Sequence, residues 1–147
     1  MTDLPIAHTV DGRPLFDNTP TVVCMLVRHH AGLVVIRRAN QPGYGLLGLP
    51  GGYHMRGESW QLAGAREVAE ETGYVIDPAQ IRQFREVVTD TYGNNLIIGL
   101  YRQYNLAYDT ALINPDETLE VLSQMRIGSA EEWAFPLHYA AAVELMR

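Results

Sequence analysis

The sequence contains one cysteine, Cys24, among its 147 residues. An intramolecular disulfide is therefore excluded, and nothing favours an oxidising compartment. Cys24 lies in the apolar stretch "TVVCMLV" of residues 21–27. In that setting we expect a buried strand thiol and not a nucleophile.

Long apolar runs and basic blocks are also absent. No apolar stretch approaches the roughly 20 residues of a membrane helix, and the first residues lack the basic and apolar regions of a signal peptide. We therefore expect a cytoplasmic protein with no membrane partner. The net charge is −6, and the longest basic run is Arg37-Arg38. Duplex nucleic acid needs a basic footprint and is not expected as a partner, whereas a free nucleotide needs only a local site.

The composition is that of a globular protein, with 47% hydrophobic and 19% charged residues. The length predicts one domain over residues 1–147, large enough to bury a core without disulfides. A homodimer is compatible with these bounds.

Hydrophobic patterning and turn residues predict an α+β protein. Ser59 is a good N-cap and Gly73 a good left-handed C-cap, which predicts a helix over 59–72. A second helix is predicted over 136–147, and the glycine- and proline-rich stretch 40–52 is expected to be loop. The sequence "YGNN" at 92–95 is typical of a hairpin turn. Strands are predicted over 21–28, 33–37, 74–77, 81–91, 95–108 and 119–127.

Three glutamates, Glu67, Glu70 and Glu71, fall within five consecutive positions of the first predicted helix. Positions i, i+3 and i+4 share a helix face, so these carboxylates project together and repel one another. A bound divalent cation would reverse the sign of that interaction, and carboxylate oxygens suit Mg²⁺ or Mn²⁺. The alternative is that the glutamates simply face solvent. The glycine-rich loop before the helix and the spacing of the residues around the cluster argue against it.

The spacing around this cluster resembles the complete Nudix box. The match comprises Gly52, five residues, Glu58, seven residues, Arg66-Glu67-Val68, Ala69, Glu70-Glu71, Thr72, Gly73 and Tyr74. At ordinary residue frequencies such a match arises by chance about once in ~10⁶ chains of this length. The stretches "LPGG" at 49–52 and "RRA" at 37–39 also look like the flanks of the family's motif.

The resemblance implies a Nudix fold, in which a mixed β-sheet is sandwiched between helices and the box forms loop, helix and loop. The family hydrolyses nucleoside diphosphates linked to another moiety, using Mg²⁺ or Mn²⁺. By position, it implies that Glu67, Glu70 and Glu71 are metal ligands, with the Gly51 carbonyl as a further ligand. Met55 stands where the family often has a glutamate, which removes one accessory ligand.

Supporting and substrate-binding roles follow from the same resemblance. Glu58 and Arg66 correspond to the pair that holds the loop against the helix. Arg38 and Gly52 correspond to positions that contact substrate. The general base is either a box glutamate or an acidic residue on a later loop, and Glu117 and Glu120 are the later candidates.

The substrate expected is a small nucleoside diphosphate derivative, either ADP-ribose-like or a nucleoside triphosphate. Tyr92 and the segment 133–136, "WAFP", faintly resemble substrate-specific elements of some relatives, but chance and the lead-in to the last helix explain them better. The adjacent His29 and His30 are expected to face solvent and not to form a metal site.

Two other functions remain open at this point. One is a Nudix-fold nucleotide sensor without catalysis, against which the intact glutamates and Arg66 argue. The other is a diphosphate isomerase of the same fold, which needs a catalytic cysteine in the active-site region. Cys24 precedes the box by many residues and lies in a predicted strand.

Overall fold

Strand β3 (Thr21–His29) is the centre of a mixed sheet in the computed structural model, which describes residues 3–147. Strand β10 (Asn95–Arg102) pairs with it in parallel from Thr21 to Arg28. The remaining members are β4 (Gly32–Arg38), β5 (Leu47–Gly48), β6 (Gly51–Tyr53), β8 (Arg82–Gln83), β9 (Val88–Thr89) and β12 (Thr118–Gln124). Within the described residues the sheet runs β12-β4-β3-β10-β8, and β5, β6 and β9 pair beside this path.

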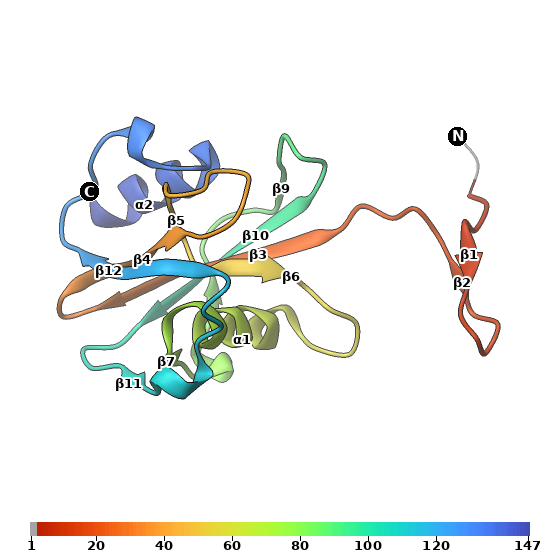
Figure 1. The fold of residues 1–147 in the computed structure, drawn as a ribbon, viewed down its shortest axis with the longest axis horizontal. Coiled ribbons are helices and arrows are strands. Elements are labelled where there is room, and N and C mark those ends of the chain that lie inside the picture. The colour runs from red at the N-terminus through yellow and green to blue at the C-terminus, as the bar shows by residue number, and fades with distance from the viewer. Residues whose placement is uncertain (1–2) are drawn as a thin grey trace.

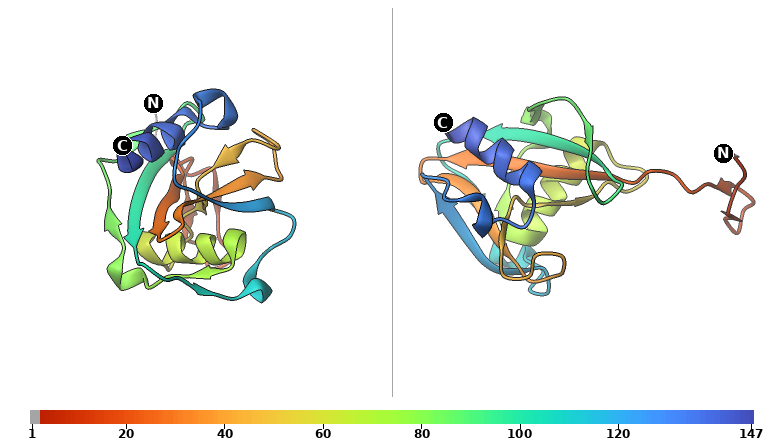
Figure 2. Two further views of the ribbon diagram at one scale, coloured as in Figure 1. Left: turned by 90° about the vertical axis from the view of Figure 1, so that its left-hand side faces the viewer. Right: turned by 90° about the horizontal axis from the view of Figure 1, so that it is seen from above.

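Two helices lie on opposite faces of the sheet, as Figures 1 and 2 show. They are α1 (Trp60–Thr72) and α2 (Pro136–Met146). The expected α+β class and the sandwich of helix, mixed sheet and helix are confirmed. Neither helix of residues 3–147 combines the length and the hydropathy needed to cross a bilayer. Smaller elements connect the layers: β7 (Tyr74–Val75), β11 (Ala107–Tyr108), and the 3₁₀ turns η1 (Pro78–Gln80), η2 (Thr110–Leu112) and η3 (Ala130–Glu132).

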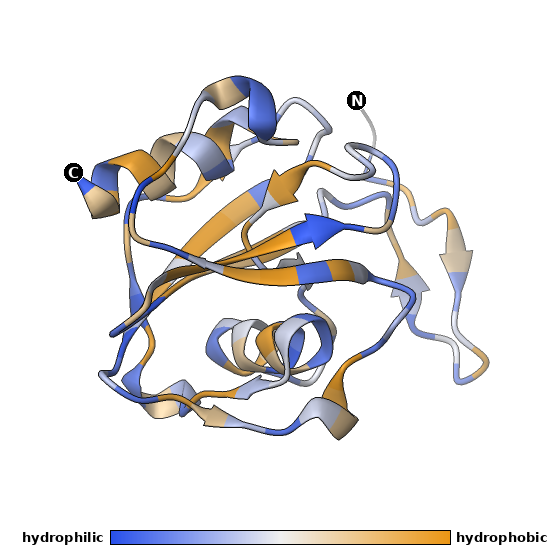
Figure 3. Cartoon of the chain, turned by 60° about the vertical axis from the view of Figure 1, so that its left-hand side comes forward, coloured by the Kyte–Doolittle hydropathy of each residue, from blue (hydrophilic) through white to orange (hydrophobic). Residues whose placement is uncertain are grey.

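The continuous apolar run of β3 supplies both layers of the core. Side chains alternate across a strand, so Met25 packs with Val68 of α1 while Leu26 packs with Ala141 of α2. All four are fully buried. Figure 3 shows the apolar strands between the helices, with hydrophilic residues on much of α1. A run apolar on both faces is what a strand covered on both sides requires.

The hairpin of β3 and β4 opens toward one end, which makes room for the segment before α1. The two strands pair only near their turn, at Arg28 with Leu33 and at His29 with Gly32. Farther along, β6 pairs with β3 and β5 pairs with β4. The glycine-rich stretch 40–52 was expected to be loop only, and this part of the expectation was wrong. Within it, β5 and β6 form hydrogen bonds with backbone groups that β4 and β3 leave unpaired where they diverge.

The caps of α1 are confirmed. The Ser59 hydroxyl accepts a hydrogen bond from the Leu62 amide at 3.1 Å, and Gly73 adopts the left-handed conformation with φ of 80°. Other boundaries differ from the sequence prediction. Residues 81–91 form two short strands instead of one, because only their ends pair with β10. The strand predicted over 95–108 ends at Arg102.

An N-terminal hairpin was not anticipated from the sequence. It consists of β1 (Ala7–His8) and β2 (Pro14–Leu15), which pair antiparallel. Figure 1 and the right-hand view of Figure 2 show it standing away from the rest of the molecule, connected through the extended segment before β3.

Candidate active site

Arg66 joins the loop before α1 to the helix. Its Nε and Nη2 donate to the two carboxylate oxygens of Glu58 at 3.1 and 2.7 Å, and Nη2 also donates to the Tyr53 carbonyl at 3.1 Å. A bidentate arginine–carboxylate pair is among the strongest side-chain contacts. The hydrogen bonds from Arg66 lower the pKa of Glu58 to about 2. The loop therefore folds back onto the helix and is held there.

The remaining amino group of Arg66 faces the acidic cluster. Nη1 donates to Glu67 Oε1 at 2.8 Å and lies 3.5 Å from Glu70 Oε2. One arginine thus contacts three carboxylates, counting Glu58, so these four groups together retain a charge of −2 when ionised. That residual charge favours a cation nearby.

Glu67 and Glu71 point inward, toward β6, and both are buried. The Gly51 amide donates to Glu71 Oε1 at 2.8 Å. A Cβ added to Gly52 would lie 2.5 Å from Glu67 Oε1, so only glycine permits this approach of strand and carboxylate. Burial is the main cause that raises the pKa of Glu67 and raises that of Glu71 further. The sequence had predicted the acidic residues along one edge of the helix, but two of them lie against the sheet.

The later loop brings Glu117 to this cluster. The Asn114 amide donates to the Glu70 carbonyl at 2.6 Å, and the Asn114 side chain donates to Glu117 Oε1 at 3.3 Å. Glu120 lies farther along the chain, in β12, and its Oε1 forms an ion pair with Arg37 Nε at 3.1 Å. Of the two downstream candidates, the fold therefore places Glu117 beside the box glutamates and directs Glu120 elsewhere.

Glu67, Glu70 and Glu117 lie close enough together to hold a divalent cation. Each offers a carboxylate oxygen, and these oxygens all lie within 4.8 Å of one another. Opposite ligands of an octahedral Mg²⁺ ion lie about 4 Å apart, since each Mg–O distance is about 2.0–2.1 Å. Oxygen-only donors suit Mg²⁺ or Mn²⁺ and not softer metals. Glu71 is bonded to the Gly51 amide in the same region, and the roles of Glu71 and the Gly51 carbonyl as ligands stay predictions.

A pocket of about 530 Å³ opens beside Gly51 and Gly52. Its wall includes residues from β3, the 38–42 turn, the β9–β10 turn and the start of α2. Tyr92 and Phe135 meet edge to face there, with ring centroids 5.8 Å apart. Aromatic walls of this kind suit the flat face of a nucleobase.

Arg38 lies in the same pocket wall. Its guanidinium stacks 4.8 Å from the centre of the Phe135 ring, and its Nε donates to the Pro42 carbonyl at 2.9 Å. No carboxylate of residues 3–147 forms an ion pair with it. Arg38 therefore retains nitrogen donors and a positive charge for an anionic ligand, beside the glycines that lead to the acidic cluster.

Comparison with known protein families gives one match that covers most of the chain. The model of the NUDIX domain family matches residues 17–138. The chain belongs to the Nudix family. The expectation of an enzyme, a hydrolase acting on pyrophosphate-containing substrates, is confirmed at this level. The comparison with curated proteins found no match.

Solved structures of Nudix proteins share the fold. A NUDIX hydrolase from Nitrosomonas europaea superposes with a TM-score of 0.64 at 19% identity, covering 92% of this chain and 73% of that one. The NUDIX domain of Shewanella oneidensis NrtR, solved with ADP ribose, gives 0.64 at 21% identity, with 89% and 86% covered. A bifunctional NMN adenylyltransferase/ADP ribose pyrophosphatase from Francisella tularensis, solved with AMP and a Mn ion, gives 0.61 at 20% identity. The superposition covers 89% of this chain and 42% of that one.

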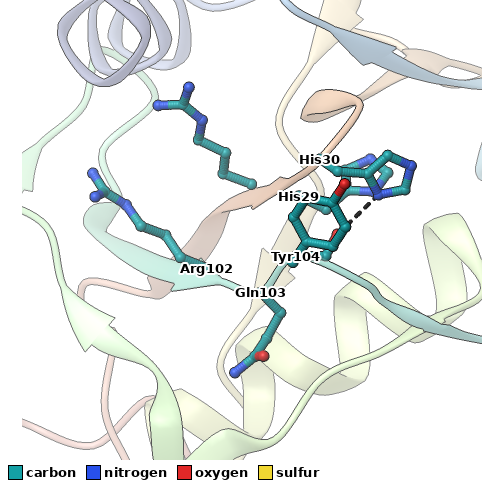
Figure 4. A pocket seen from close by; sticks show the side chains of 6 residues that line it. His29, His30, Arg102, Gln103 and Tyr104 are labelled. Atoms are coloured by element: carbon teal, nitrogen blue, oxygen red, sulfur yellow. Dashed lines mark hydrogen bonds between the residues drawn. The ribbon is translucent and has the colours of Figure 1, made fainter.

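His29 and His30 lie at the end of β3 opposite to the part that pairs with β6, and the His29 ring centroid is 5.6 Å from that of Tyr74, the last residue of the box. They line a separate cavity of about 420 Å³ with Arg102, Gln103 and Tyr104, shown in Figure 4. His30 Nδ1 is hydrogen-bonded to the Tyr104 carbonyl at 2.8 Å, and His29 Nε2 to the Ser123 hydroxyl at 2.8 Å. The two rings meet edge to face and have different partners. His30 is exposed, as expected, whereas His29 is half-buried. That the pair forms no metal site stays a prediction.

Phe135 is the pocket residue that sequence reasoning missed. The segment 133–136 was interpreted as the lead-in to α2, and it is one, with Pro136 in the first turn. The same segment also presents Phe135 to the pocket. A signal was available, because the residue directly before a proline is restricted to extended backbone and so stands outside the helix. The sequence did not show that α2 begins at the pocket that Gly51 and Gly52 also line.

Proposed function

We propose that the protein is a metal-dependent pyrophosphohydrolase that cleaves a nucleoside diphosphate linked to another group. The observation that carries this proposal is the position of the carboxylate cluster of Glu67, Glu70 and Glu117 next to an aromatic pocket with an unpaired arginine, Arg38. A diphosphate ester with a flat base needs these three features together: cation ligands, a cationic contact and a stacking surface.

The division of labour follows from the chemistry of phosphoryl transfer, which depends on positioning and on neutralising charge. When bound, Mg²⁺ or Mn²⁺ supplies positive charge opposite the diphosphate oxygens and makes an attacking water more acidic. Glu67, Glu70 and Glu71 hold the cation site at the helix, and Arg38 contacts a phosphate from the pocket side. Glu58 and Arg66 fix the loop that follows β6, the strand of Gly51 and Gly52.

Glu117 is our choice for the general base, so in this proposal the cation is held by the glutamates of α1 and Glu117 lies beside it without binding it. It lies on a loop and not on α1, it is hydrogen-bonded to Asn114, and its carboxylate lies within 4.8 Å of an oxygen of Glu67 and of Glu70. A base must lie within hydrogen-bond reach of the attacking water while remaining ionised. Glu120 is occupied by Arg37, so it takes no part in the proposed reaction.

For the substrate we favour a free nucleotide derivative of the ADP-ribose type, with nucleoside triphosphates second. The Shewanella domain was solved with ADP ribose and the Francisella protein with AMP and Mn, which supports an adenine nucleotide. Capped RNA is disfavoured, because an RNA chain needs several basic side chains along a groove. The chain has 11 basic against 17 acidic residues.

The diphosphate isomerase alternative depends on Cys24. Its thiol lies in the pocket wall but is fully buried on β3, and burial raises its pKa to about 12. A thiol that stays protonated near neutral pH is a poor nucleophile. This environment favours a packing role for Cys24 and supports hydrolysis over isomerisation.

The direct test is a side-by-side assay of ADP-ribose, diadenosine polyphosphates, NADH, dNTPs and capped RNA with Mg²⁺ and with Mn²⁺. We expect turnover of at least one free nucleotide derivative, abolished by excess chelator and restored by added metal. Full turnover in chelator would contradict the metal requirement. Binding of ADP-ribose without turnover of any substrate would instead support the sensor alternative.

A further inference from the structure

The cavity shown in Figure 4 is separate from the pocket of the candidate active site. Its volume of about 420 Å³ lies within the roughly 300–1,000 Å³ that is usual for small-molecule sites. Its walls are the ends of β3 and β10, which lie side by side, and the Gln103 amide donates to the Arg28 carbonyl there at 3.1 Å. No residue lines both this cavity and the larger pocket. A ligand bound here would therefore leave the candidate active site free.

Two arginines stand next to each other in this cavity. Arg28 and Arg102 are aligned partners in the parallel pairing of β3 with β10. Neighbouring strands lie about 4.8 Å apart, and aligned side chains leave the same face of the sheet. Neither arginine forms an ion pair with a carboxylate of residues 3–147. Two positive charges at this spacing repel each other, and an anion bound by both would replace that repulsion with attraction.

A third arginine adds to the positive charge at this end of the sheet. Arg82 of β8 is aligned with Leu100, two residues before Arg102, so Arg82 and Arg102 lie on the same face. Both line a neighbouring cavity of about 590 Å³. Within the described residues Arg82 also has no ion pair. In a chain with a net charge of −6, this face presents local positive charge to an anionic ligand.

Aromatic rings form another part of the cavity wall. Tyr104 is 75% exposed, and its ring centroid lies 5.2 Å from that of His30. The His30 ring is held in place, because its Nδ1 is hydrogen-bonded to the Tyr104 carbonyl at 2.8 Å and its centroid lies 5.1 Å from that of His29. Figure 4 shows these rings on one side and Arg102 on the other. An exposed ring that is supported by a second ring is suited to stacking on a nucleobase.

We propose that this cavity is a second, non-catalytic nucleotide site, in which Arg28 and Arg102 bind the phosphate and Tyr104 stacks on the base. Arginine is the side chain best suited to phosphate, because its planar guanidinium donates two hydrogen bonds to one group. A bare anion would leave the aromatic wall unused, and an uncharged aromatic ligand would leave the arginines uncompensated. A nucleotide meets both requirements. The inference does not rest on the proposed reaction, since it uses no residue of the carboxylate cluster or of the pocket beside it.

The first test is a titration of the full chain with AMP in excess chelator, followed by NMR. AMP carries a base and a phosphate, has no phosphoanhydride to cleave, and in chelator has no cation to bridge it to the glutamates. We expect saturable shifts of the resonances of His29, His30 and Tyr104. The resonances of Tyr92 and His138 report separately on the other pocket. Unmoved signals of the first three residues at saturating AMP would overturn the proposal, whatever the other two show.

The second test assigns the phosphate contact. Arg28→Gln and Arg102→Gln should each weaken AMP binding at this cavity by about tenfold or more, because each removes a charged donor to the phosphate. Arg13→Gln makes the same change of net charge at an exposed position between β1 and β2, and it should leave the affinity within about twofold. Arg102 is exposed, so its variant tests the proposal even where Arg28→Gln does not fold. Equal weakening by all three variants would show a general charge effect and overturn the site.

The third test assigns the base contact. Tyr104→Leu should weaken AMP binding at the cavity by about fivefold or more, whereas the weaker binding of inorganic phosphate should not change. Phosphate that binds as tightly as AMP, with no effect of Tyr104→Leu on either, would overturn the assignment to a nucleotide. Turnover is measured on the same variants. Absent AMP binding at the cavity with normal kcat would overturn this site alone, and binding at the cavity without turnover of any substrate would overturn only the proposed reaction.

Discussion

The Gly51 amide and the Glu71 carboxylate are joined by a hydrogen bond of 2.8 Å across 20 positions of sequence. This bond fixes β6 against α1 at the point where the box glutamates meet the pocket. It also gives a buried carboxylate one partner while leaving its second oxygen without a hydrogen bond in residues 3–147. One oxygen of Glu71 therefore has a structural task, and the proposed function assigns the other oxygen to the cation site.

Glu71→Gln should lower kcat by at least about 100-fold while the protein stays folded. The amide oxygen of glutamine still accepts the hydrogen bond from Gly51, but the negative charge at the cation site is lost. The measurement is steady-state kinetics at saturating Mg²⁺, with circular dichroism as the check on folding. Wild-type kcat in a folded variant would show that the charge of Glu71 takes no part in the reaction and that its role is the hydrogen bond to Gly51.

Glu117→Gln and Glu120→Gln form a matched pair, three residues apart in sequence. The first should lower kcat by about 100-fold or more, as expected on loss of a general base. The second should leave kcat within about twofold, since Glu120 makes only an exposed ion pair with Arg37. If both variants were equally active, the base would have to be one of the box glutamates.

Arg66→Ala should lower both stability and activity. It leaves Glu58 without its bidentate partner and Glu67, a buried acid, without its hydrogen bond. The loss in the free energy of unfolding should be about 1–3 kcal/mol, measured by urea denaturation. Arg66→Lys should recover part of it, because an ammonium keeps the charge but not the bidentate contact. An unchanged unfolding midpoint in Arg66→Ala would mean that the pair does not hold the loop.

His138 should make stability depend on pH. Its Nδ1 accepts a hydrogen bond from the Leu49 amide at 3.1 Å, and burial, assisted by Arg38, lowers its pKa from 6.5 to about 3. Below pH 6.5 the His138 imidazole binds a proton in the unfolded chain, whereas in the folded state it stays neutral down to about pH 3. Stability from this group is therefore fully present above pH 6.5 and falls by about 1.4 kcal/mol per unit toward pH 3.

The measurement compares urea unfolding of the unmodified chain and His138→Gln at pH 7.5 and pH 5. Carboxylates titrate in both proteins, so the difference between the two isolates the histidine. We expect the advantage of the unmodified chain to shrink by about 2 kcal/mol over this range. His8→Gln, a change at an exposed histidine of the N-terminal hairpin, should show no such change. A difference that is independent of pH would show that His138 is protonated in the folded state.

Cys24→Ala should retain activity. Hydrolysis as proposed uses no thiol, and the buried side chain contributes packing only. We expect kcat within about threefold and a loss of about 1 kcal/mol in stability, as for removal of a small buried group. A loss of all turnover in the folded variant would revive the isomerase alternative.

The sequence predicted the helix of the box almost to the residue, because Ser59 and Gly73 are local signals that act within one turn. It also predicted that Arg66 and Glu58 would meet, which hydrogen bonds now show. It could not choose between Glu117 and Glu120. That choice depends on where β12 starts pairing with β4, which is a contact between segments some 80 residues apart.

The short strands were the least predictable part of the fold. β5 and β6 form inside a stretch rich in glycine and proline because β3 and β4 diverge, and divergence leaves no trace in local composition. The same holds for the inward direction of Glu67 and Glu71. Carboxylates are rarely buried, so sequence patterning assigns them to solvent unless a ligand is assumed.

The parallel pairing of β3 with β10 has a consequence for how the molecule forms. Asn95 aligns with Thr21, so the central pair of strands closes a loop of more than 70 residues. Closing such a loop costs entropy before any core contact repays it, which slows folding. During synthesis the helix of the box is complete long before β10 and the loop with Glu117 leave the ribosome. The carboxylate cluster, which needs Glu117, is therefore among the last features of the molecule to assemble.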